Sequence, residues 1–300
     1  MEMNLQQLRQ AFIEVGYIAE ENVIMTVFLA LILKKPLLIE GEPGVGKTEV
    51  AKALSLIFSL DLIRLQCYEG LDESRALYEW NYQRQLLKIH LQKDCTTESM
   101  EKNLFDPEYL LARPLLKAIM AKKRTVLLID EIDKTDEQFE AFLFEILSEY
   151  QVSIPEWGVI QAEHIPIVVL TSNHDRDLSD GLRRRCVYLY IDYPSIEKEV
   201  AIIEKKVPEI NPRLAQEIGV AIQWIRKITV LEKKPAISET LDWAQALMAL
   251  GIVTLDQRAI DQTLGLILKH ENDLRHFNEQ VGSKGLCEEV KTYLTGETRN

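Results

Sequence analysis

The sequence predicts an α/β protein in which a parallel sheet is followed by a small all-helical domain. Three observations predict this class. A short apolar run, 36–40, leads into a glycine-rich loop and then into a helical pattern at 49–58. Two later apolar runs, 125–129 and 165–170, also end in polar residues, as buried parallel strands do at one edge of a sheet. After Pro194 no strand pattern recurs, and helical segments broken by prolines follow.

Length and composition suit this organisation. The chain has 300 residues, of which 47% are hydrophobic and 27% are charged, and this leaves room for one large domain or two smaller ones. We predict an α/β core over 1–193, with an N-terminal helix and an insertion within about 66–112, and a helical lid over 194–300. Four scattered cysteines without C-x-x-C spacing indicate reduced thiols rather than a metal site.

The start of the chain and its charge set expectations for location and partners. The stretch from Met1 to Asn4 lacks the basic start and apolar run of a signal peptide. The longest apolar stretch, 23–33, is too short to span a bilayer, so we expect a cytoplasmic protein without a membrane span. The formal net charge of −12 argues against general binding to nucleic acid, since that affinity comes from lysine and arginine.

The loop after the first strand matches the phosphate-binding pattern G-x-x-x-x-G-K-[ST] without interruption. It consists of Gly41, Glu42, Pro43, Gly44, Val45, Gly46, Lys47 and Thr48, and Glu49 follows at the start of the helix. The glycines let successive backbone N–H groups point at one anion. Lys47 is expected to reach the β- and γ-phosphates of a nucleotide, and Thr48 to offer its hydroxyl to Mg²⁺.

The two later strands deliver polar side chains that suit the same chemistry. Asp130 ends the first of them and is expected to hold Mg²⁺, while Glu131 is placed to polarise a water for attack on the γ-phosphate. Asn173 follows the second strand and would orient that water. An asparagine that caps the next turn is the simpler interpretation of Asn173 alone, but the ordered set of three favours a nucleotide site.

A run of three arginines, 183–185, precedes the last predicted strand at 187–191. A solvated surface is the usual interpretation of such a run. In an oligomer, however, one arginine would reach the γ-phosphate held by the next subunit and stabilise the charge of the transition state. We predict that Arg184 or Arg185 does so, with Arg185 preferred because it lies nearer the strand.

Taken in order, these motifs resemble those of AAA+ ATPases, and of the MoxR group in particular. They read GEPGVGKT, LLIDEID and LTSN, followed by LRRRC before the last strand. The stretches 67–72, 76–82 and 238–244 resemble the CoxD-like branch, which is associated with maturation of carbon monoxide dehydrogenase. The resemblance covers about 10–255. The fold that it implies is a P-loop parallel-sheet AAA+ core followed by the helical lid.

This resemblance also carries functional expectations. It implies a homohexameric ring with ATP between subunits, and a Mg²⁺-dependent ATPase that acts as a chaperone on a protein client. Such a chaperone would remodel or mature a partner enzyme, for example by inserting a metallocofactor into a molybdenum hydroxylase, together with a protein that carries a von Willebrand factor A domain. One departure is visible. Many MoxR lids carry Ser-Pro-Arg where this chain has Ser238, Glu239 and Thr240, and Thr240 cannot supply the positive charge.

Two other functions stay open at this point. The first is an ATP-gated assembly scaffold with slow hydrolysis, which the missing lid arginine favours. The second is a DNA-directed AAA+ ATPase, which the acidity of the chain disfavours. Among the aromatic residues we favour core positions for Trp80 and Tyr82. Trp157 lies beside a predicted turn, and since a hairpin near this point faces the pore in the family, Trp157 is a candidate contact for a substrate chain.

Overall fold

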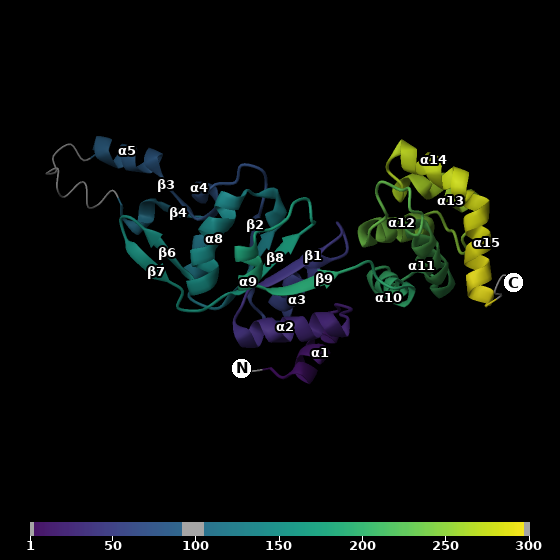
Figure 1. Ribbon diagram of the computed structural model, residues 1–300, viewed down its shortest axis with the longest axis horizontal. Coiled ribbons are helices and arrows are strands. Elements are labelled where there is room, and N and C mark those ends of the chain that lie inside the picture. Colours follow the sequence, from purple (N-terminus) through teal and green to yellow (C-terminus); the bar gives the residue numbers. More distant parts are fainter. Residues whose placement is uncertain (1–2, 92–104, 297–300) are drawn as a thin grey trace. The chain divides into compact units, whose positions relative to one another are not determined.

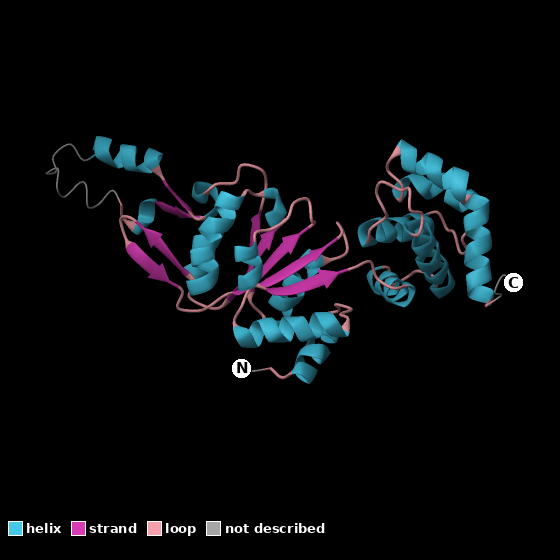
Figure 2. Ribbon diagram, in the orientation of Figure 1, coloured by secondary structure: helices cyan, strands magenta, loops and turns pink. Residues whose placement is uncertain are grey.

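A computed structural model describes residues 3–91 and 105–296 (Figure 1). The chain divides into two compact units, one formed by 1–41 with 47–190 and the other by 42–46 with 191–300. Strands occur throughout the first unit, whereas the second is helical beyond the end of the last strand (Figure 2). The tip of the glycine-rich loop, 42–46, thus groups with the helical unit.

The first unit is built on a five-stranded sheet with the strand order β2-β5-β8-β1-β9. Its strands are β1 (Leu37–Gly41), β2 (Asp61–Gln66), β5 (Thr125–Asp130), β8 (Ile167–Ser172) and β9 (Val187–Ile191). The pairs β2 with β5, β5 with β8, and β8 with β1 are parallel. Every residue of β1, β5 and β8 is buried. Near-continuous apolar runs are what a sheet covered on both faces requires.

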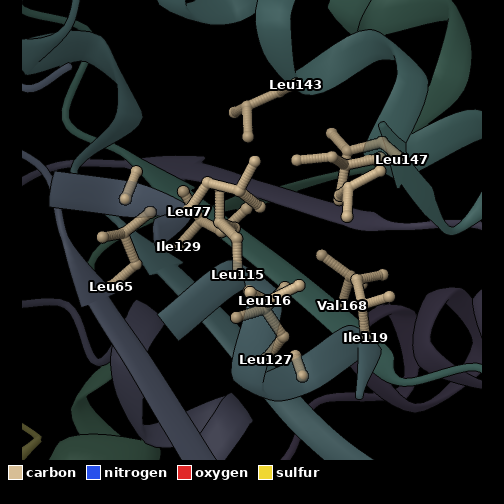
Figure 3. Close-up of a cluster of buried hydrophobic side chains, with 14 of the residues drawn as sticks. Leu65, Leu77, Leu115, Leu116, Ile119, Leu127, Ile129, Leu143, Leu147 and Val168 are labelled. Atoms are coloured by element: carbon tan, nitrogen blue, oxygen red, sulfur yellow. The ribbon is translucent and has the colours of Figure 1, made fainter. Parts of the chain in front are cut away.

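The described residues of this unit also form helices. They are α1 (Leu5–Glu14), α2 (Glu21–Leu33), α3 (Lys47–Phe58), α4 (Glu73–Ala76), α5 (Tyr82–Leu91), α7 (Pro114–Ile119), α8 (Glu137–Glu149) and α9 (Asp180–Arg185). In the core shown in Figure 3, Leu115 and Leu116 of α7 pack with Leu127 of β5 and Leu143 of α8. Each of these side chains is fully buried, and burial of one leucine contributes about 1.5–3 kcal/mol.

Residues 66–112 include a small antiparallel pair, β3 (Tyr78–Trp80) with β4 (Leu110–Ala112), and a short 3-10 helix, Pro107–Tyr109. Trp80 is buried, as expected. The expectation for Tyr82 is wrong, because Tyr82 is 62% exposed. It begins α5, which is attached mainly through polar contacts, such as the pairing of Arg84 and Lys88 with Glu108.

The predicted hairpin is formed by β6 (Gln151–Ile154) and β7 (Gly158–Gln161), which are antiparallel. Trp157 in its turn does not simply face solvent. The indole N–H donates to the carbonyl oxygen of Phe105 at 2.8 Å, and the ring meets Trp80 edge-on, 5.9 Å between centroids. The exposed apolar side chain of this hairpin is instead Val159, at 62%.

The second unit contains α10 (Ile196–Lys206), α11 (Pro212–Arg226), α12 (Ile237–Ala249), α13 (Gln257–Thr263), α14 (Glu271–Gln280) and α15 (Gly282–Thr295), with a 3-10 turn at Leu264–Leu266. Helix α11 is central and contacts α10, α12 and α15. It begins where the side chain of Asn211 caps the Arg213 N–H and Pro212 occupies the first turn, a favoured helix start. A parallel-sheet core followed by a helical region confirms the predicted fold class.

Candidate functional site

The glycine-rich loop joins β1 to α3. Gly44 and Gly46 have φ angles of +75° and +97°, which side-chain-bearing residues rarely adopt. A Cβ on Gly44 would lie 2.5 Å from the Cβ of Ala236, whereas a Cβ on Gly46 would meet nothing within 4 Å. Lys47 is 6% exposed, and its Nζ donates to the carbonyl oxygen of Gly41 at 2.7 Å. The ammonium group is therefore held across the base of the loop.

Asp130 contacts residues from two neighbouring strands, β2 and β8, and from α3, the helix that follows the glycine-rich loop. Its side chain is 4% exposed. Thr48 Oγ1 donates to Asp130 Oδ1 at 3.1 Å, and Thr171 Oγ1 donates to the same atom at 2.5 Å. Arg64 Nη2 lies 2.5 Å from Asp130 Oδ2. Parallel strands end at a common edge of the sheet, so residues from β2, β5 and β8 converge on one carboxylate.

Thr171 is a site residue that the sequence analysis missed. It is 1% exposed, and besides donating to Asp130 it accepts the backbone N–H of Glu131 at 2.9 Å. Glu131 has φ 59° and ψ 52°, a left-handed conformation that is uncommon outside glycine. The hydroxyl therefore fixes both acids. A hydroxyl residue near the end of the strand before Asn173 was the available signal.

Asn173 is brought to the same edge through Asp133. The backbone N–H groups of Asn173 and Asp175 donate to Asp133 Oδ2 at 2.9 and 3.0 Å. Asp133 is 4% exposed and lies in the short 3-10 helix that follows Glu131, so it ties together the loops after β5 and β8. Within the two described ranges, neither the Glu131 carboxylate nor the Asn173 side-chain amide has a hydrogen-bond partner.

Burial and the acids at this edge together raise the pKa of the Cys67 thiol. Burial, followed by the charges of Asp130, Asp133 and Glu131, raises the pKa of Cys67 to about 12. The thiol is therefore protonated near neutral pH. Since the thiolate is the reactive form, Cys67 is no nucleophile.

The first of the three arginines is engaged next to the loop. Arg183 Nη2 and Nη1 lie 2.9 and 3.1 Å from the two carboxylate oxygens of Glu40. Glu40 is fully buried and directly precedes the loop. His174 Nε2 is 3.3 Å from the same carboxylate. Arg183 thus braces the strand that leads into the loop.

The other two arginines differ sharply in their contacts. Arg185 Nε donates to Ser148 Oγ at 2.7 Å, and its guanidinium lies over the ring of Phe144, 4.3 Å from the centroid. Arg184 is exposed and makes no such contact with any residue that the structure describes. Arg184 is therefore the one of these two candidates whose side chain is not engaged within its own chain.

Thr240, at the position where many lids of the resembled group carry arginine, is fully buried within the helical unit. Its hydroxyl donates to Glu199 Oε1 at 2.7 Å. Arg226 donates to both oxygens of Glu199, at 2.5 and 2.8 Å, and its Nε donates to the carbonyl oxygen of Pro235. The buried arginine of this unit is thus fully occupied by internal partners.

This fold and this site define a nucleotide-binding core of the AAA+ ATPase class. The chain belongs to the AAA domain family (dynein-related subfamily), which matches residues 36–186. Among solved structures, a mutant of RuvB from Thermotoga maritima is 15% identical, with a TM-score of 0.50, and the match covers 89% of this chain and 72% of that one.

A second structure is described as the Thermotoga maritima RuvB Holliday junction branch migration motor. It is 14% identical with a TM-score of 0.47, and the match again covers 89% of this chain and 72% of that one. At these identities the likeness concerns the fold alone. No curated protein matches the chain. None of the helices in the described ranges combines the length and apolarity that crossing a membrane demands.

Proposed function

We propose that the protein is a Mg²⁺-dependent ATPase that acts as a MoxR-type chaperone. The observation that carries the ATPase is the convergence of Thr48 and Thr171 on Asp130, beside a loop whose Lys47 is buried across its base. A hydroxyl, a carboxylate and an ammonium group gathered at one edge of a parallel sheet suit phosphoryl transfer, in which positioning and charge stabilisation dominate.

The residues present fit a nucleotide and a divalent cation. The positive φ of Gly46, and the open space where its Cβ would stand, suit a backbone wrapped around phosphate. Thr48 Oγ1 and Asp130 Oδ1 are hard oxygen donors 3.1 Å apart, the kind that Mg²⁺ prefers. Mg²⁺ at such sites uses only one or two carboxylates, and the described residues form no group of three or more metal-binding side chains. When bound, the cation would neutralise charge on the phosphates.

Each residue then has a role in hydrolysis. The loop from Gly41 to Thr48 and the next residue, Glu49, surround the phosphates, and Lys47 offsets their charge. Glu131 accepts a proton from the attacking water, and Asn173 orients that water. The freedom of both side chains from internal hydrogen bonds in the described part of the chain supports these roles. Thr48 and Asp130 hold the cation.

We assign the arginine that acts on the neighbouring subunit to Arg184 rather than Arg185. Arg185 would have to give up its bond to Ser148 and its position over Phe144, a cation–π contact worth about 0.5–1 kcal/mol at a partly exposed site. Arg184 is exposed at the end of α9. A closed ring of identical subunits, which we propose to be a hexamer, would bring it to the γ-phosphate of the next subunit.

The chaperone role rests on the motif resemblance and on individual exposed apolar side chains. Leu86 and Leu87 of α5 and Val159 of the hairpin are 56%, 59% and 62% exposed, which suits contact with a protein client. More specifically, we propose that the client is a metalloenzyme, such as a molybdenum hydroxylase, whose maturation the chaperone assists. It would act in the cytoplasm, together with a protein that carries a von Willebrand factor A domain.

Of the two alternatives, only the scaffold has specific support. The scaffold is favoured by Thr240, which stands where many lids of the resembled group have a positively charged arginine. Its hydroxyl donates to Glu199 and supplies no positive charge. A DNA-directed motor is suggested by the description of RuvB, but a likeness of fold carries no function. The net charge of −12 opposes it.

Steady-state hydrolysis and binding of a fluorescent ATP analogue test the proposal. Glu131→Gln should bind nucleotide as the wild type does and lose turnover by about 10²–10⁴-fold, the contribution of a positioned general base. Lys47→Ala should lose binding as well. Turnover retained by Glu131→Gln contradicts the role of Glu131, and turnover that rises with DNA and falls with salt would favour the DNA-directed motor.

A further inference from the structure

Arg64 lies where it can reach the second oxygen of Asp130. It is on β2, whose register with β5 places Gln66 opposite Asp130. Side chains alternate along a strand, so Arg64 and Gln66 share one face. Arg64 Nη2 contacts both Asp130 Oδ2 and Gln66 Oε1, each at 2.5 Å.

The carboxylate of Asp130 is thereby engaged on both sides. Oδ1 receives the hydroxyls of Thr48 and Thr171, and Oδ2 receives the guanidinium of Arg64. The Asp130 side chain is 4% exposed, so water has little access to replace a lost partner. A buried carboxylate without compensation is strongly destabilising, and Arg64 provides that compensation.

Arg64 and Asp130 differ in how well water could solvate each of them if the ion pair separated. The Arg64 side chain is 52% exposed, so it keeps much of its hydration and can turn toward solvent or stay on Gln66. Asp130 has no such freedom. Asp130 Oδ2 therefore loses its compensation unless another donor or cation replaces Arg64, and Arg64 is the partner that can move.

We propose that Arg64 is a resident counter-ion that competes with the divalent cation for Asp130. The inference rests on the proposed ATPase function. Without nucleotide, Arg64 covers Oδ2, and it releases that atom when a divalent cation is held beside Thr48. Arg64 thus raises the Mg²⁺ concentration that nucleotide binding requires, and it covers the acid again when the site empties.

The test is a Mg²⁺ titration of the binding of a fluorescent ATP analogue to the full chain, starting in EDTA. Arg64→Gln should lower the Mg²⁺ concentration at half-maximal binding about fivefold, equivalent to about 1 kcal/mol, the upper end for a partly exposed ion pair. Arg64→Lys should lower it by a smaller factor, since lysine keeps the charge but lacks the planar fork. Arg84→Ala is the matched control: Arg84 is also exposed and paired with a carboxylate, that of Glu108, and its loss should change nothing.

A second measurement is thermal unfolding in EDTA, where Arg64→Gln should melt below the wild type and regain the difference on addition of Mg²⁺ with nucleotide. A Mg²⁺ midpoint in Arg64→Gln equal to or above that of the wild type overturns the inference. If that variant does not fold, an unchanged midpoint in Arg64→Lys overturns it. If the wild type binds no nucleotide with or without Mg²⁺, the proposed function fails first, and this inference falls with it.

Discussion

The Thr171 hydroxyl lies 2.5 Å from Asp130 Oδ1 and accepts the backbone N–H of the next acid, Glu131, at 2.9 Å. One side chain of β8 thus contacts both Asp130, which ends β5, and Glu131, which follows it. The left-handed backbone of Glu131 depends on this bond, because a non-glycine residue does not hold that conformation without support from its surroundings.

Thr171→Val should therefore separate chemistry from binding. The substitution keeps the shape and removes the hydroxyl, which takes a partner from the part-buried Glu131 N–H and from the buried Asp130 Oδ1 and destabilises the protein by about 1–3 kcal/mol. We expect kcat to fall by up to about 100-fold, toward the lower end of what a positioned base contributes, with little change in nucleotide affinity.

The matched control is Thr125→Val. Thr125 is 3% exposed on β5, and its hydroxyl has no partner among the described residues, so its removal should be neutral or stabilising. ATPase assays and thermal unfolding of both variants check the prediction. Equal effects of the two substitutions would show that loss of a buried hydroxyl, rather than the bridge, is responsible.

Much of the fold could be predicted because short, contiguous stretches of sequence indicate its strands and its loop. Apolar runs that end in polar residues identify β1, β5 and β8, and the loop at 41–48 is a contiguous motif. Thr171 and Arg64 could not be predicted in the same way. Both reach Asp130 only because β2 and β8 are its neighbours in the sheet, and no short pattern states strand order. The contacts of Arg185 likewise depend on how α9 faces α8.

The contrast between Arg184 and Arg185 gives a second prediction. Arg184→Ala should keep nucleotide binding and lower kcat by about 10³-fold or more, the effect of losing an arginine that acts in trans. Arg185→Ala should instead lower stability by about 0.5–1 kcal/mol, since it removes a cation–π contact.

Mixing distinguishes action in trans from action within one subunit. Assemblies of Arg184→Ala with Lys47→Ala subunits should regain turnover at interfaces where an intact loop meets an intact arginine. Mixed assemblies with no more activity than either variant alone would contradict this assignment.

A third prediction concerns alkaline pH. The pKa of Cys67 is raised from its ordinary value of 9.0 to about 12, first by burial and then by the neighbouring acids. The folded state therefore binds this proton more tightly than the unfolded state. The resulting stabilisation is complete below about pH 9 and is lost as the pH rises toward 12. Cys67→Ala should show a smaller fall in melting temperature between pH 8 and pH 11 than the wild type does. Parallel curves for the two proteins would contradict the shift.

The last prediction concerns the buried pair of the helical unit. Glu199 is fully buried, and Arg226 binds both of its oxygens. Arg226→Met should destabilise the protein by about 3–5 kcal/mol, because removing one partner leaves an uncompensated charge in the interior. The double variant Arg226→Met with Glu199→Leu should recover most of that loss, since a buried ion pair adds little over apolar side chains of similar volume. Urea unfolding of these variants measures the coupling between Arg226 and Glu199. Thr240→Val, measured in the same way, reports the contribution of the hydroxyl that donates to Glu199. If Arg226→Met alone and the double variant unfold at the same urea concentration, the pair is not coupled, and the lid is held by its apolar core alone.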